Sequence, residues 1–291
     1  MSWQTIKSAY HALQQARDNQ DDLAEAWLRF KGSVFECPVP FHLNTLMRHI
    51  EEARGTMPAE DVRILDHGCG GALTLLYLAA KGYTGGFGVD ISGSTCERWN
   101  PLFTEQLRVK EQRFFVYEGG TLQFQDQLFD IVFSQEVLEH VRPSVLDEYY
   151  AEEWRVMKPG AVALHRVPHR LVPYDSHTRT WLLHYLPRPM WLASLKLLGR
   201  DLTTAREATF LRWPWIHRRY ARRYIGPTVD VSMKRFADVT DLADYEGPKG
   251  LRKIAGRSVS IPVVGPMAKA LLKNFIMVDT VSTKGSADRQ N

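Results

Sequence analysis

The stretch Val62–Ala72 (VRILDHGCGGA) decides the fold of this 291-residue chain. A short apolar run ends in an acid and three glycines, and the helix-forming run 73–81 follows directly. This order predicts a buried strand, a tight turn and a helix N-terminus. Glycines let the backbone approach a ligand closely, and a strand, glycine-rich turn and helix at the edge of a parallel sheet form a nucleotide-type site.

Strand-like and helical runs alternate on the C-terminal side of this turn. Strands are predicted at 63–66, 86–90, 113–117, 129–134 and 161–167. Helices are predicted at 73–81, 94–108, 136–139 and 144–157. Alternation of this kind predicts an α/β fold with a parallel, doubly wound sheet and right-handed crossovers.

The flanking segments have a different character. Two helical patterns, 3–31 and 41–54, precede the sheet. Residues 168–227 are rich in Trp, Tyr, Arg, His and Pro without clear alternation, and we expect an inserted helical cap there. The remaining predicted elements are a strand at 228–233, a helix at 239–245, a Gly/Lys/Arg loop at 247–257, an apolar helix at 263–273 and a strand at 274–283.

Composition narrows the class of protein. The chain has no run of 18 apolar residues and no apolar signal core near its first residues, so neither a membrane-spanning helix nor secretion is expected. Its three cysteines match no zinc motif and form no disulfide framework, which favours a reducing, cytoplasmic setting. No metal-ligand cluster is evident, so we expect no metal and no effect of a chelator on turnover.

Charge is distributed unevenly. Residues 1–185 carry 18 Lys/Arg against 24 Asp/Glu, a net charge of −6. Residues 186–291 carry 19 against 9, a net charge of +10. The basic part indicates an anionic partner, such as an acidic or phosphorylated substrate, a membrane surface or nucleic acid.

The glycine turn differs from that of a dinucleotide-binding dehydrogenase. The G-x-G-x-x-G pattern is incomplete, and Asp66 stands before the glycines. A carboxylate there would repel a pyrophosphate but suits a cationic ligand. Asp90 ends the next predicted strand, where it can accept hydrogen bonds from both ribose hydroxyls. Two acids and no phosphate-binding lysine point to a positively charged nucleoside, a description that S-adenosylmethionine fits. For each acid the alternative is structural: a helix N-cap for Asp66 and a turn acid for Asp90.

Four motifs in order carry a family resemblance: ILDHGCG at 64–70, GVDIS at 88–92, FDIVFSQEVLEHV at 129–141 and EWRVMKPG at 153–160. They resemble the motifs of class I S-adenosylmethionine-dependent methyltransferases. The resemblance implies a Rossmann-like, seven-stranded sheet whose last strand is antiparallel, with 228–233 and 274–283 as the sixth and seventh strands. The domain organisation expected from it is an N-terminal helical lid (1–58), the S-adenosylmethionine-binding core (59–167), a substrate cap (168–227), the C-terminal part of the core (228–284) and a polar tail (285–291).

The resemblance also implies which residues bind the cofactor. By position they are Asp66, Gly68, Gly70, Asp90, Ile91, Gly120, Thr121, Ser134 and Gln135. Asp90 would hold the ribose, Ile91 would pack on the adenine, and Ser134 with Gln135 would border the sulfonium.

Two positions depart from the family pattern. Ala72 stands where the family has its third glycine. Near Gly120 the family often has an acid that contacts the adenine amine, and backbone groups of Gly120 and Thr121 would have to serve instead.

The chemistry expected of such a site is an in-line displacement, in which the protein chiefly positions the acceptor. A hydroxyl acceptor must also lose a proton, which requires a general base. The segment after the fifth strand, with its Asp175-x-His177 pair, resembles a methyltransferase subgroup associated with bacterial surface polysaccharides, other glycoconjugates and natural products. There a Pro-Asn-Arg turn precedes the pair, and His169 occupies the asparagine position here.

We therefore expect His177 to be the base, supported by Asp175, with His169 as the second candidate. For either histidine the alternative is a loop residue bonded to the backbone. Arg170, Tyr174 and Arg179 of the same segment are the expected substrate-binding residues. His140 belongs to a motif that the family shares whatever the acceptor, and we interpret it as structural or as bordering the site.

The basic, aromatic segment 212–224 has several interpretations. It could bind an anionic acceptor, lie on anionic lipid as a peripheral membrane contact, or be an ordinary helix face. Nucleic acid ranks lower because no RNA-binding module accompanies the patch. Trp3, Tyr10 and Trp27 belong to helices that could close over the cofactor or simply pack on the sheet.

The expected function is methylation of a sugar or glycoconjugate hydroxyl, using S-adenosylmethionine as methyl donor. A second expectation is O- or N-methylation of a small molecule in natural-product or quinone synthesis. A third, of a different class, is a binding or scaffold protein that has lost turnover.

Overall fold

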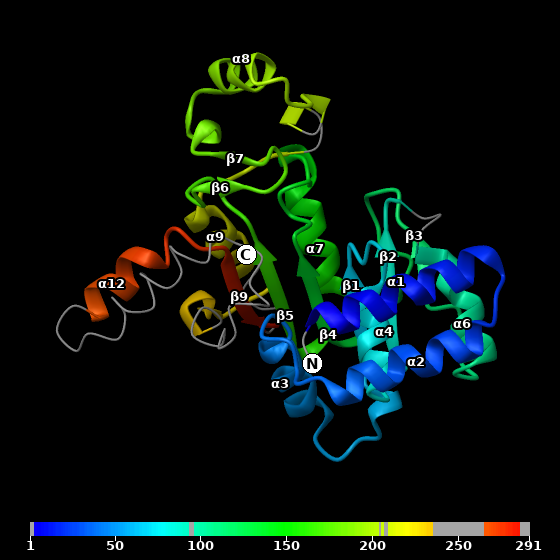
Figure 1. Ribbon diagram of the computed structural model, residues 1–291. Helices are drawn as coiled ribbons and strands as arrows, with labels where there is room; N and C mark the ends of the chain where they lie inside the picture. The colour runs from blue at the N-terminus through cyan, green and yellow to red at the C-terminus, as the bar shows by residue number, and fades with distance from the viewer. Residues whose placement is uncertain (1–2, 93–95, 204, 207–208, 235–264, 286–291) are drawn as a thin grey trace.

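A seven-stranded sheet forms the centre of the computed structural model, which describes residues 3–92, 96–203, 205–206, 209–234 and 265–285 (Figure 1). Its strands are β1 (Ile64–His67), β2 (Gly86–Asp90), β3 (Phe114–Val116), β4 (Phe129–Gln135), β5 (Met157–Val167), β8 (Thr228–Asp230) and β9 (Val278–Thr283). They are ordered β3-β2-β1-β4-β5-β9-β8. β1 to β5 pair in parallel, whereas β9 is antiparallel to both β5 and β8. The predicted fold class is confirmed.

The two faces of the sheet bury separate clusters of apolar side chains because neighbouring strand residues point in opposite directions. On one face, Ile64 and Ile131 pack with α1 (Trp3–Asn19), α2 (Leu23–Glu36), α3 (Asn44–Arg54) and α4 (Leu73–Ala80). On the other, Leu65 and Val132 pack with α7 (Leu146–Val156) and α9 (Pro214–Tyr224). The parallel strands are therefore covered on both sides, as their apolar sequences require.

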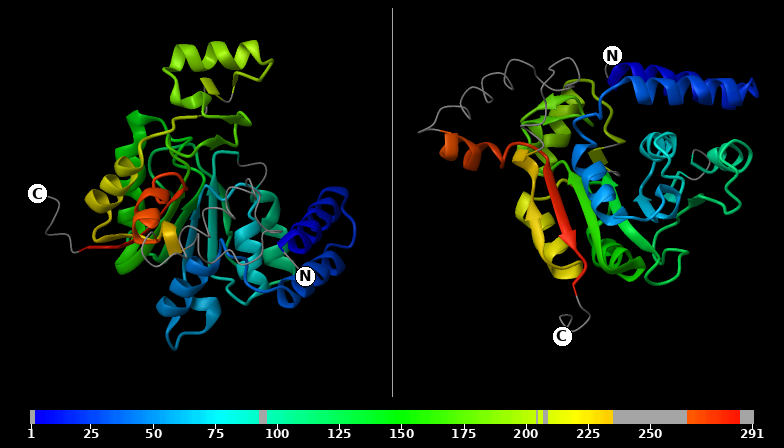
Figure 2. Two further views of the ribbon diagram at one scale, coloured as in Figure 1. Left: turned by 60° about the vertical axis from the view of Figure 1, so that its left-hand side comes forward. Right: turned by 90° about the horizontal axis from the view of Figure 1, so that it is seen from below.

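Residues between β5 and β8 form two structurally different parts. A two-stranded hairpin, β6 (Tyr174–Asp175) with β7 (Thr180–Trp181), and helix α8 (Arg188–Leu197) stand apart from the sheet (Figure 2). Helix α9 instead packs on the sheet beside α7, where Tyr150 stacks near Tyr220 at 5.7 Å between ring centroids. The segment expected to be one cap thus includes a helix of the core layer.

The remaining short elements complete the chain. They are the 3-10 turns η1 (Ala59–Asp61), η2 (Glu97–Trp99), η3 (Pro143–Val145) and η4 (Leu183–Tyr185), and the helices α6 (Asn100–Glu105) and α12 (Gly265–Leu272). No helix within the described ranges combines the length and the apolarity that a membrane crossing needs.

Some predicted elements differ from those observed. The helix expected over 3–31 is broken, because Asp22 caps a new helix by accepting a hydrogen bond from the Glu25 N–H. The helix expected at 136–139 is a turn that begins at Glu136 in the left-handed conformation (φ 58°). The predicted helix 239–245 and loop 247–257 lie outside the described residues.

Candidate methyl-donor and acceptor site

The glycine turn after β1 is held against the end of β2 by three backbone donors. The N–H groups of Gly68 and Cys69 donate to the Val89 carbonyl, and the Gly70 N–H donates to Asp90 Oδ2 at 2.7 Å. Gly68 has φ +96° and Gly70 has φ +49°, a region that side chains disfavour. A Cβ at Gly68 would collide with Val137, whereas the space in front of Gly70 is open. The turn therefore leaves room for a ligand on the side of Gly70.

Ala72, which replaces the third family glycine, is the N-cap residue of α4. It adopts the left-handed conformation with φ 63° and is fully buried. This conformation costs an alanine roughly 1–2 kcal/mol. The backbone thus keeps the course that a glycine would favour, although the residue carries a methyl group.

Two carboxyl groups, those of Asp66 and Asp90, lie near each other at the turn. Burial, together with the neighbouring Asp90, raises the pKa of Asp66 well above its usual range. Asp90 Oδ1 accepts hydrogen bonds from the backbone and hydroxyl of Ser92 at 2.8 and 2.6 Å. A cation placed between these acids would relieve their repulsion.

Beside Asp90, the Ile91 side chain is 76% exposed. A large apolar side chain left in solvent next to a polar site suits a flat, apolar ring such as adenine.

The stretch 118–121 follows β3 on the same edge of the sheet. Gly120 has φ 79°, and its carbonyl accepts a hydrogen bond from the Tyr117 hydroxyl at 2.8 Å. Thr121 is exposed. Gly120 is thus in a conformation that an acid at this position would disfavour, which accounts locally for the departure from the family pattern.

Ser134 leads into a buried polar network that the sequence analysis missed. The Tyr149 hydroxyl lies 2.9 Å from Ser134 Oγ, and the Tyr149 ring stacks on His67 at 3.9 Å. His67 and His165 contact the two oxygens of Glu153, at 3.1 and 2.7 Å. Burial alone would raise the pKa of Glu153, but the two histidines outweigh it and lower this pKa to about 2. Glu153 therefore joins β1, β5 and α7 just beneath the turn.

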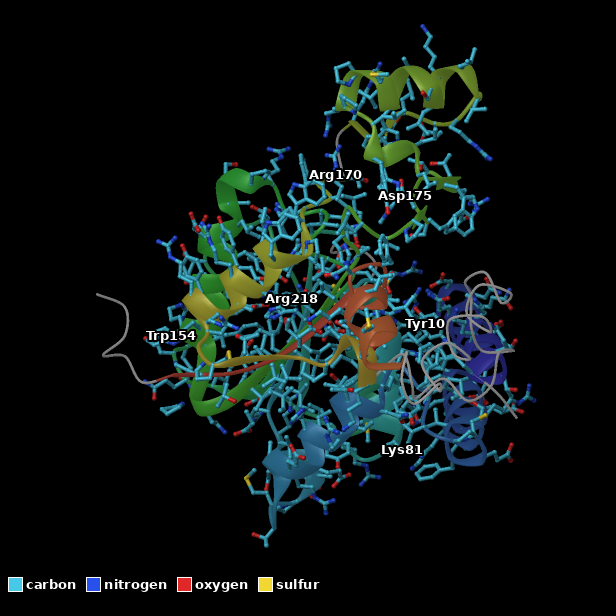
Figure 3. The ribbon with its side chains drawn as sticks, turned by 90° about the vertical axis from the view of Figure 1, so that its left-hand side faces the viewer. Tyr10, Lys81, Trp154, Arg170, Asp175 and Arg218 are labelled. Atoms are coloured by element: carbon cyan, nitrogen blue, oxygen red, sulfur yellow. The ribbon has the colours of Figure 1, made fainter. Side chains whose placement is uncertain are left out.

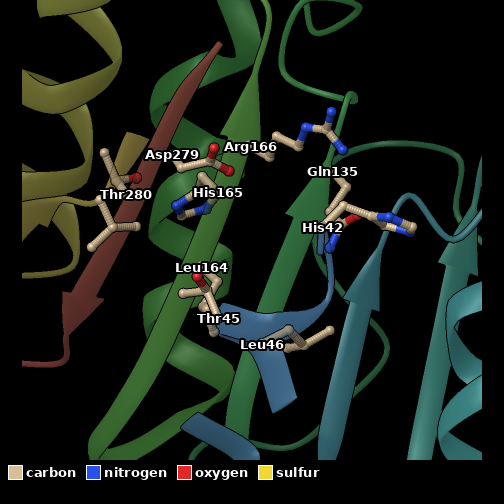
Figure 4. Close-up of a pocket in the computed structure, with 10 residues that line it drawn as sticks. His42, Thr45, Leu46, Gln135, Leu164, His165, Arg166, Asp279 and Thr280 are labelled. Carbon is tan, nitrogen blue, oxygen red and sulfur yellow. The ribbon is translucent and has the colours of Figure 1, made fainter. Parts of the chain in front are cut away.

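Gln135 faces a small pocket at the ends of β4, β5 and β9 (Figure 4). Thr45 and Leu46 of α3 close this pocket from the other side. Its volume of about 20 Å³ suffices for one water molecule but not for a nucleoside. The pocket thus adjoins the expected cofactor site without being that site.

His177 and Asp175 are in direct contact on the hairpin that follows β5. His177 Nδ1 lies 3.1 Å from Asp175 Oδ1, and Asp175 Oδ2 accepts a hydrogen bond from the Thr178 hydroxyl at 2.6 Å. Residues two apart in sequence need not face each other, but here the turn between β6 and β7 folds the imidazole back onto the carboxylate. The hydrogen bond that His177 donates to Asp175 outweighs burial and raises the pKa of His177.

The turn after β4 brings two further side chains to this pair. His140 Nε2 lies 3.3 Å from His177 Nε2, and Glu139 Oε1 lies 3.9 Å from each of these nitrogens. Glu139 is fully buried, and burial raises the pKa of its carboxyl to about 8. His140 thus contacts the expected base His177, and the contact bridges 37 residues of sequence.

His169 lies apart from this group. It is buried, its Nε2 lies 2.7 Å from the Ile276 carbonyl, and its Nδ1 accepts a hydrogen bond from the Leu171 N–H at 3.1 Å. Both ring nitrogens therefore already have backbone partners, and burial lowers the pKa of this histidine to about 4.

The three residues expected to bind substrate are differently engaged. Arg170 donates to the carbonyls of Leu186 and Tyr185, which attaches the start of the segment to the base of α8 (Figure 3). Tyr174 packs against Trp181 across the hairpin, at 5.3 Å between centroids. Arg179 is exposed at the turn of the hairpin.

The basic segment 212–224 divides into buried and exposed members. Arg212 is buried and donates to the carbonyls of Leu138 and Val141, so it holds the turn that carries Glu139 and His140. Arg218 pairs with Asp230 at 2.6 Å. The exposed members are Trp213, Trp215, Arg219, Arg222 and Arg223.

Comparison with known families identifies the core. Residues 65–164, from β1 to β5, match a family model described as "Methyltransferase domain". The chain is accordingly an S-adenosylmethionine-dependent methyltransferase: the motif at 88–92 lies within this match, the motif at 64–70 overlaps its start, and both stand at the strand ends described above.

The fold of this chain is similar to the solved structures of several methyltransferases. A geranyl diphosphate methyltransferase in complex with S-adenosylmethionine has 12% identity and a TM-score of 0.47, over 88% of this chain and 90% of that one. A phosphoethanolamine N-methyltransferase from Haemonchus contortus has 16% identity and a TM-score of 0.45, over 84% and 53%. A mycolic acid cyclopropane synthase has 18% identity and a TM-score of 0.45, over 82% and 84%. Similarities at this level say nothing about the acceptor of this methyltransferase.

Proposed function

We propose that the methyltransferase transfers the methyl group of S-adenosylmethionine to a hydroxyl oxygen of a sugar or glycoconjugate, with His177 activating that hydroxyl. The observation that carries the proposal is the contact of the His177–Asp175 pair with the turn that follows β4. The donor residues Ser134 and Gln135 end β4, and His140 follows them by only a few residues. This contact supports a position of the pair beside the donor.

The hydrogen bond to Asp175 supports this role through the tautomer that it favours. An Nδ1–H that donates to the carboxylate leaves the lone pair of His177 on Nε2. Nε2 then lies 3.3 Å from His140 Nε2, and His140 is 35% exposed on that side. His169 does not compete for this role in the proposal, because both of its ring nitrogens have backbone partners.

A sugar acceptor is supported by the side chains that surround the pair. Tyr174 and Trp181 form an aromatic pair on the same hairpin, and Trp181 is 45% exposed. Aromatic faces of this kind pack on the apolar face of a sugar ring while hydroxyl groups remain free for polar contacts. The resemblance of the segment after β5, with its Asp175-x-His177 pair, to the polysaccharide-associated subgroup points in the same direction.

The test combines product detection with a matched pair of variants. The enzyme and S-adenosylmethionine are incubated with nucleotide sugars, free glycans, phenols and amines, and methylated products are identified by mass spectrometry. With the best acceptor, His177→Gln should lower kcat by about 100- to 10,000-fold, while the Kd for S-adenosylmethionine stays within about twofold of wild type. His11→Gln, at an exposed histidine on α1, should leave both values unchanged.

Two results would contradict the proposal. Full turnover by His177→Gln would remove the histidine from the chemistry. If amines were methylated and none of the hydroxyl compounds in the panel were, the acceptor would be an amine and not a sugar hydroxyl.

A further inference from the structure

Three side chains beside the proposed acceptor site direct one nitrogen or oxygen atom each toward a common point. Proton transfer by His177 does not require this arrangement. The atoms concerned are His140 Nε2, His177 Nε2 and Glu139 Oε1, which come from the turn after β4 and from the β6–β7 hairpin. They lie 3.3, 3.9 and 3.9 Å from one another. We propose that Glu139, His140 and His177 bind a divalent first-row transition-metal ion such as Zn²⁺, with Asp175 as the residue that positions His177.

The distances suit such an ion. Ligands at about 2.0–2.1 Å from a tetrahedral Zn²⁺ lie roughly 3.4 Å from each other, so the observed triangle needs only a small contraction. Two imidazoles and one carboxylate with an open position form a ligand set typical of catalytic zinc and of non-haem iron. Imidazole nitrogens also favour these ions over Mg²⁺ and Ca²⁺, which prefer oxygen ligands.

The burial of the Glu139 carboxyl group supports the metal site independently of the distances. Its side chain is completely buried, and neither carboxyl oxygen has a hydrogen-bond partner among the described residues beyond its own backbone N–H. Leaving a carboxyl group buried in this way is costly unless a cation or donor completes it. A metal ion at the centre of the triangle would supply that partner, and the charge of Glu139 would then be retained.

The surroundings have the features that metal sites usually show. Asp175 accepts from His177 Nδ1 at 3.1 Å, which directs Nε2 toward the proposed ion, and Thr178 fixes the other oxygen of Asp175. Arg212 holds the backbone on both sides of Glu139 and His140 through the carbonyls of Leu138 and Val141. His140 remains 35% exposed, so the site is open to an entering ion or acceptor on that side.

The proposal reverses the expectation of no metal and stands whichever acceptor is used. It also replaces the base role of His177 in the proposed function, because His177 Nε2 cannot bind a metal ion and accept a proton at once. In the metal-loaded enzyme the ion, rather than His177, would lower the pKa of an acceptor hydroxyl. The competing arrangement has no metal: one imidazole donates to the other and Glu139 is protonated.

The experiment measures metal binding directly, without an acceptor. Full-length enzyme lacking a polyhistidine tag is stripped with a chelator, reloaded with Zn²⁺ or Co²⁺, passed through gel filtration and analysed for metal content. We expect one bound equivalent that excess Mg²⁺ does not displace, and visible Co²⁺ absorption bands of a low-coordinate site. His177→Gln and Glu139→Gln should each lose this equivalent, and Asp175→Asn should weaken binding by about 10- to 100-fold.

Controls keep the outcome separate from unfolding and from the proposed function. His11→Gln should keep the bound equivalent, and circular dichroism of the metal-free variants should show the wild-type melting profile. Absence of a bound equivalent in folded wild type, or metal binding that survives both His177→Gln and Glu139→Gln, would overturn the proposal. A metal-loaded enzyme that methylates only amines would contradict the proposed function while leaving the metal site intact.

Discussion

His169 lies just after β5, and both of its ring nitrogens contact backbone groups. Its Nδ1 accepts from the Leu171 N–H and its Nε2 contacts the Ile276 carbonyl, so the neutral ring satisfies two main-chain groups at once. Protonation would add a proton to Nδ1 and break the first of these bonds. The sequence alone does not distinguish this role from that of a base, because Ile276 lies 107 residues away.

This arrangement predicts acid sensitivity. The pKa of His169 falls from 6.5 to about 4, chiefly through burial. Above pH 6.5 the folded and unfolded states are both neutral at this residue, and its contribution to stability is complete. As the pH falls from 6.5 to about 4, the unfolded state takes up the proton first, and on the order of 3 kcal/mol of stability is lost.

Urea unfolding at pH 7.5 and pH 5.0 checks this prediction. Wild type should lose on the order of 2 kcal/mol more than His169→Gln between these pH values. The surrounding groups Arg218, Asp230 and His184 are present in both proteins, so their contributions cancel in the comparison. Equal losses in the two proteins would show that His169 does not titrate in this range.

At the scale of elements, α1 is attached directly to the donor turn. The Tyr10 hydroxyl donates to the Gly71 carbonyl at 2.6 Å, and the Trp99 indole N–H donates to the same carbonyl at 2.9 Å. A Cβ at Gly71 would collide with the Tyr10 hydroxyl, so this glycine is required by the helix as much as by a ligand. These contacts give the lid expected of the N-terminal helices a physical connection to the turn.

Tyr10→Phe should therefore weaken cofactor binding. Loss of one hydrogen bond, worth about 1 kcal/mol, should raise the Kd for S-adenosylmethionine about fivefold, as measured by calorimetry. Tyr77→Phe is the matched control, because the Tyr77 hydroxyl is buried without a hydrogen-bond partner among the described residues. If the two variants bound the cofactor equally well, the contact with Gly71 would have no part in shaping the site.

What the sequence predicted depends on how far apart the interacting residues lie. The glycine turn, Asp90 and the alternating strands are local patterns, and the resulting fold class was correct. Asp175 and His177 could be linked because they are two residues apart. Glu139 and His140, in contrast, reach His177 only after β5 has crossed the sheet and the hairpin has turned back, so no local pattern predicts the cluster.

A similar limit applies to the buried network around Glu153. Its partners His67 and His165 come from β1 and β5, 86 and 12 residues away. Both histidines were visible in the sequence, but only the packing of α7 on the sheet joins them. The prediction of one helix over 3–31 was wrong for a different reason. The apolar periodicity continues past residue 22, but Asp22 caps a new helix there.

At the scale of the whole molecule, the basic C-terminal part is not a uniform surface. Arg212 donates hydrogen bonds to backbone carbonyls, and Arg218 forms an ion pair with Asp230. Arg219, Arg222 and Arg223, in contrast, line an open groove beside Trp215 on α9. We propose that this exposed face meets an anionic surface, with the lipid headgroup as the first candidate. Each exposed arginine near an anionic bilayer contributes about 1 kcal/mol.

Vesicle sedimentation tests this expectation. Binding to vesicles containing phosphatidylserine should exceed binding to neutral phosphatidylcholine vesicles, fall as salt rises, and drop by about tenfold or more in Arg222→Glu/Arg223→Glu. Arg29→Glu, an exposed arginine on α2, is the control for net charge. Binding that is insensitive to salt would exclude an anionic partner at this face.

The position of β9 has a consequence for how the molecule is made. β9 separates β5 from β8, and Thr228 at the start of β8 pairs with Ser282 of β9. A chain emerging from the ribosome therefore releases β8 about fifty residues before its neighbour β9, a delay of roughly 2–10 s at ordinary rates of synthesis. Throughout that delay the hydrogen-bonding edge of β5 is uncovered, as the edge of an unfinished sheet. An incomplete sheet with an uncovered strand edge is prone to pair with other chains, so we expect the nascent chain to be most prone to aggregation in this interval.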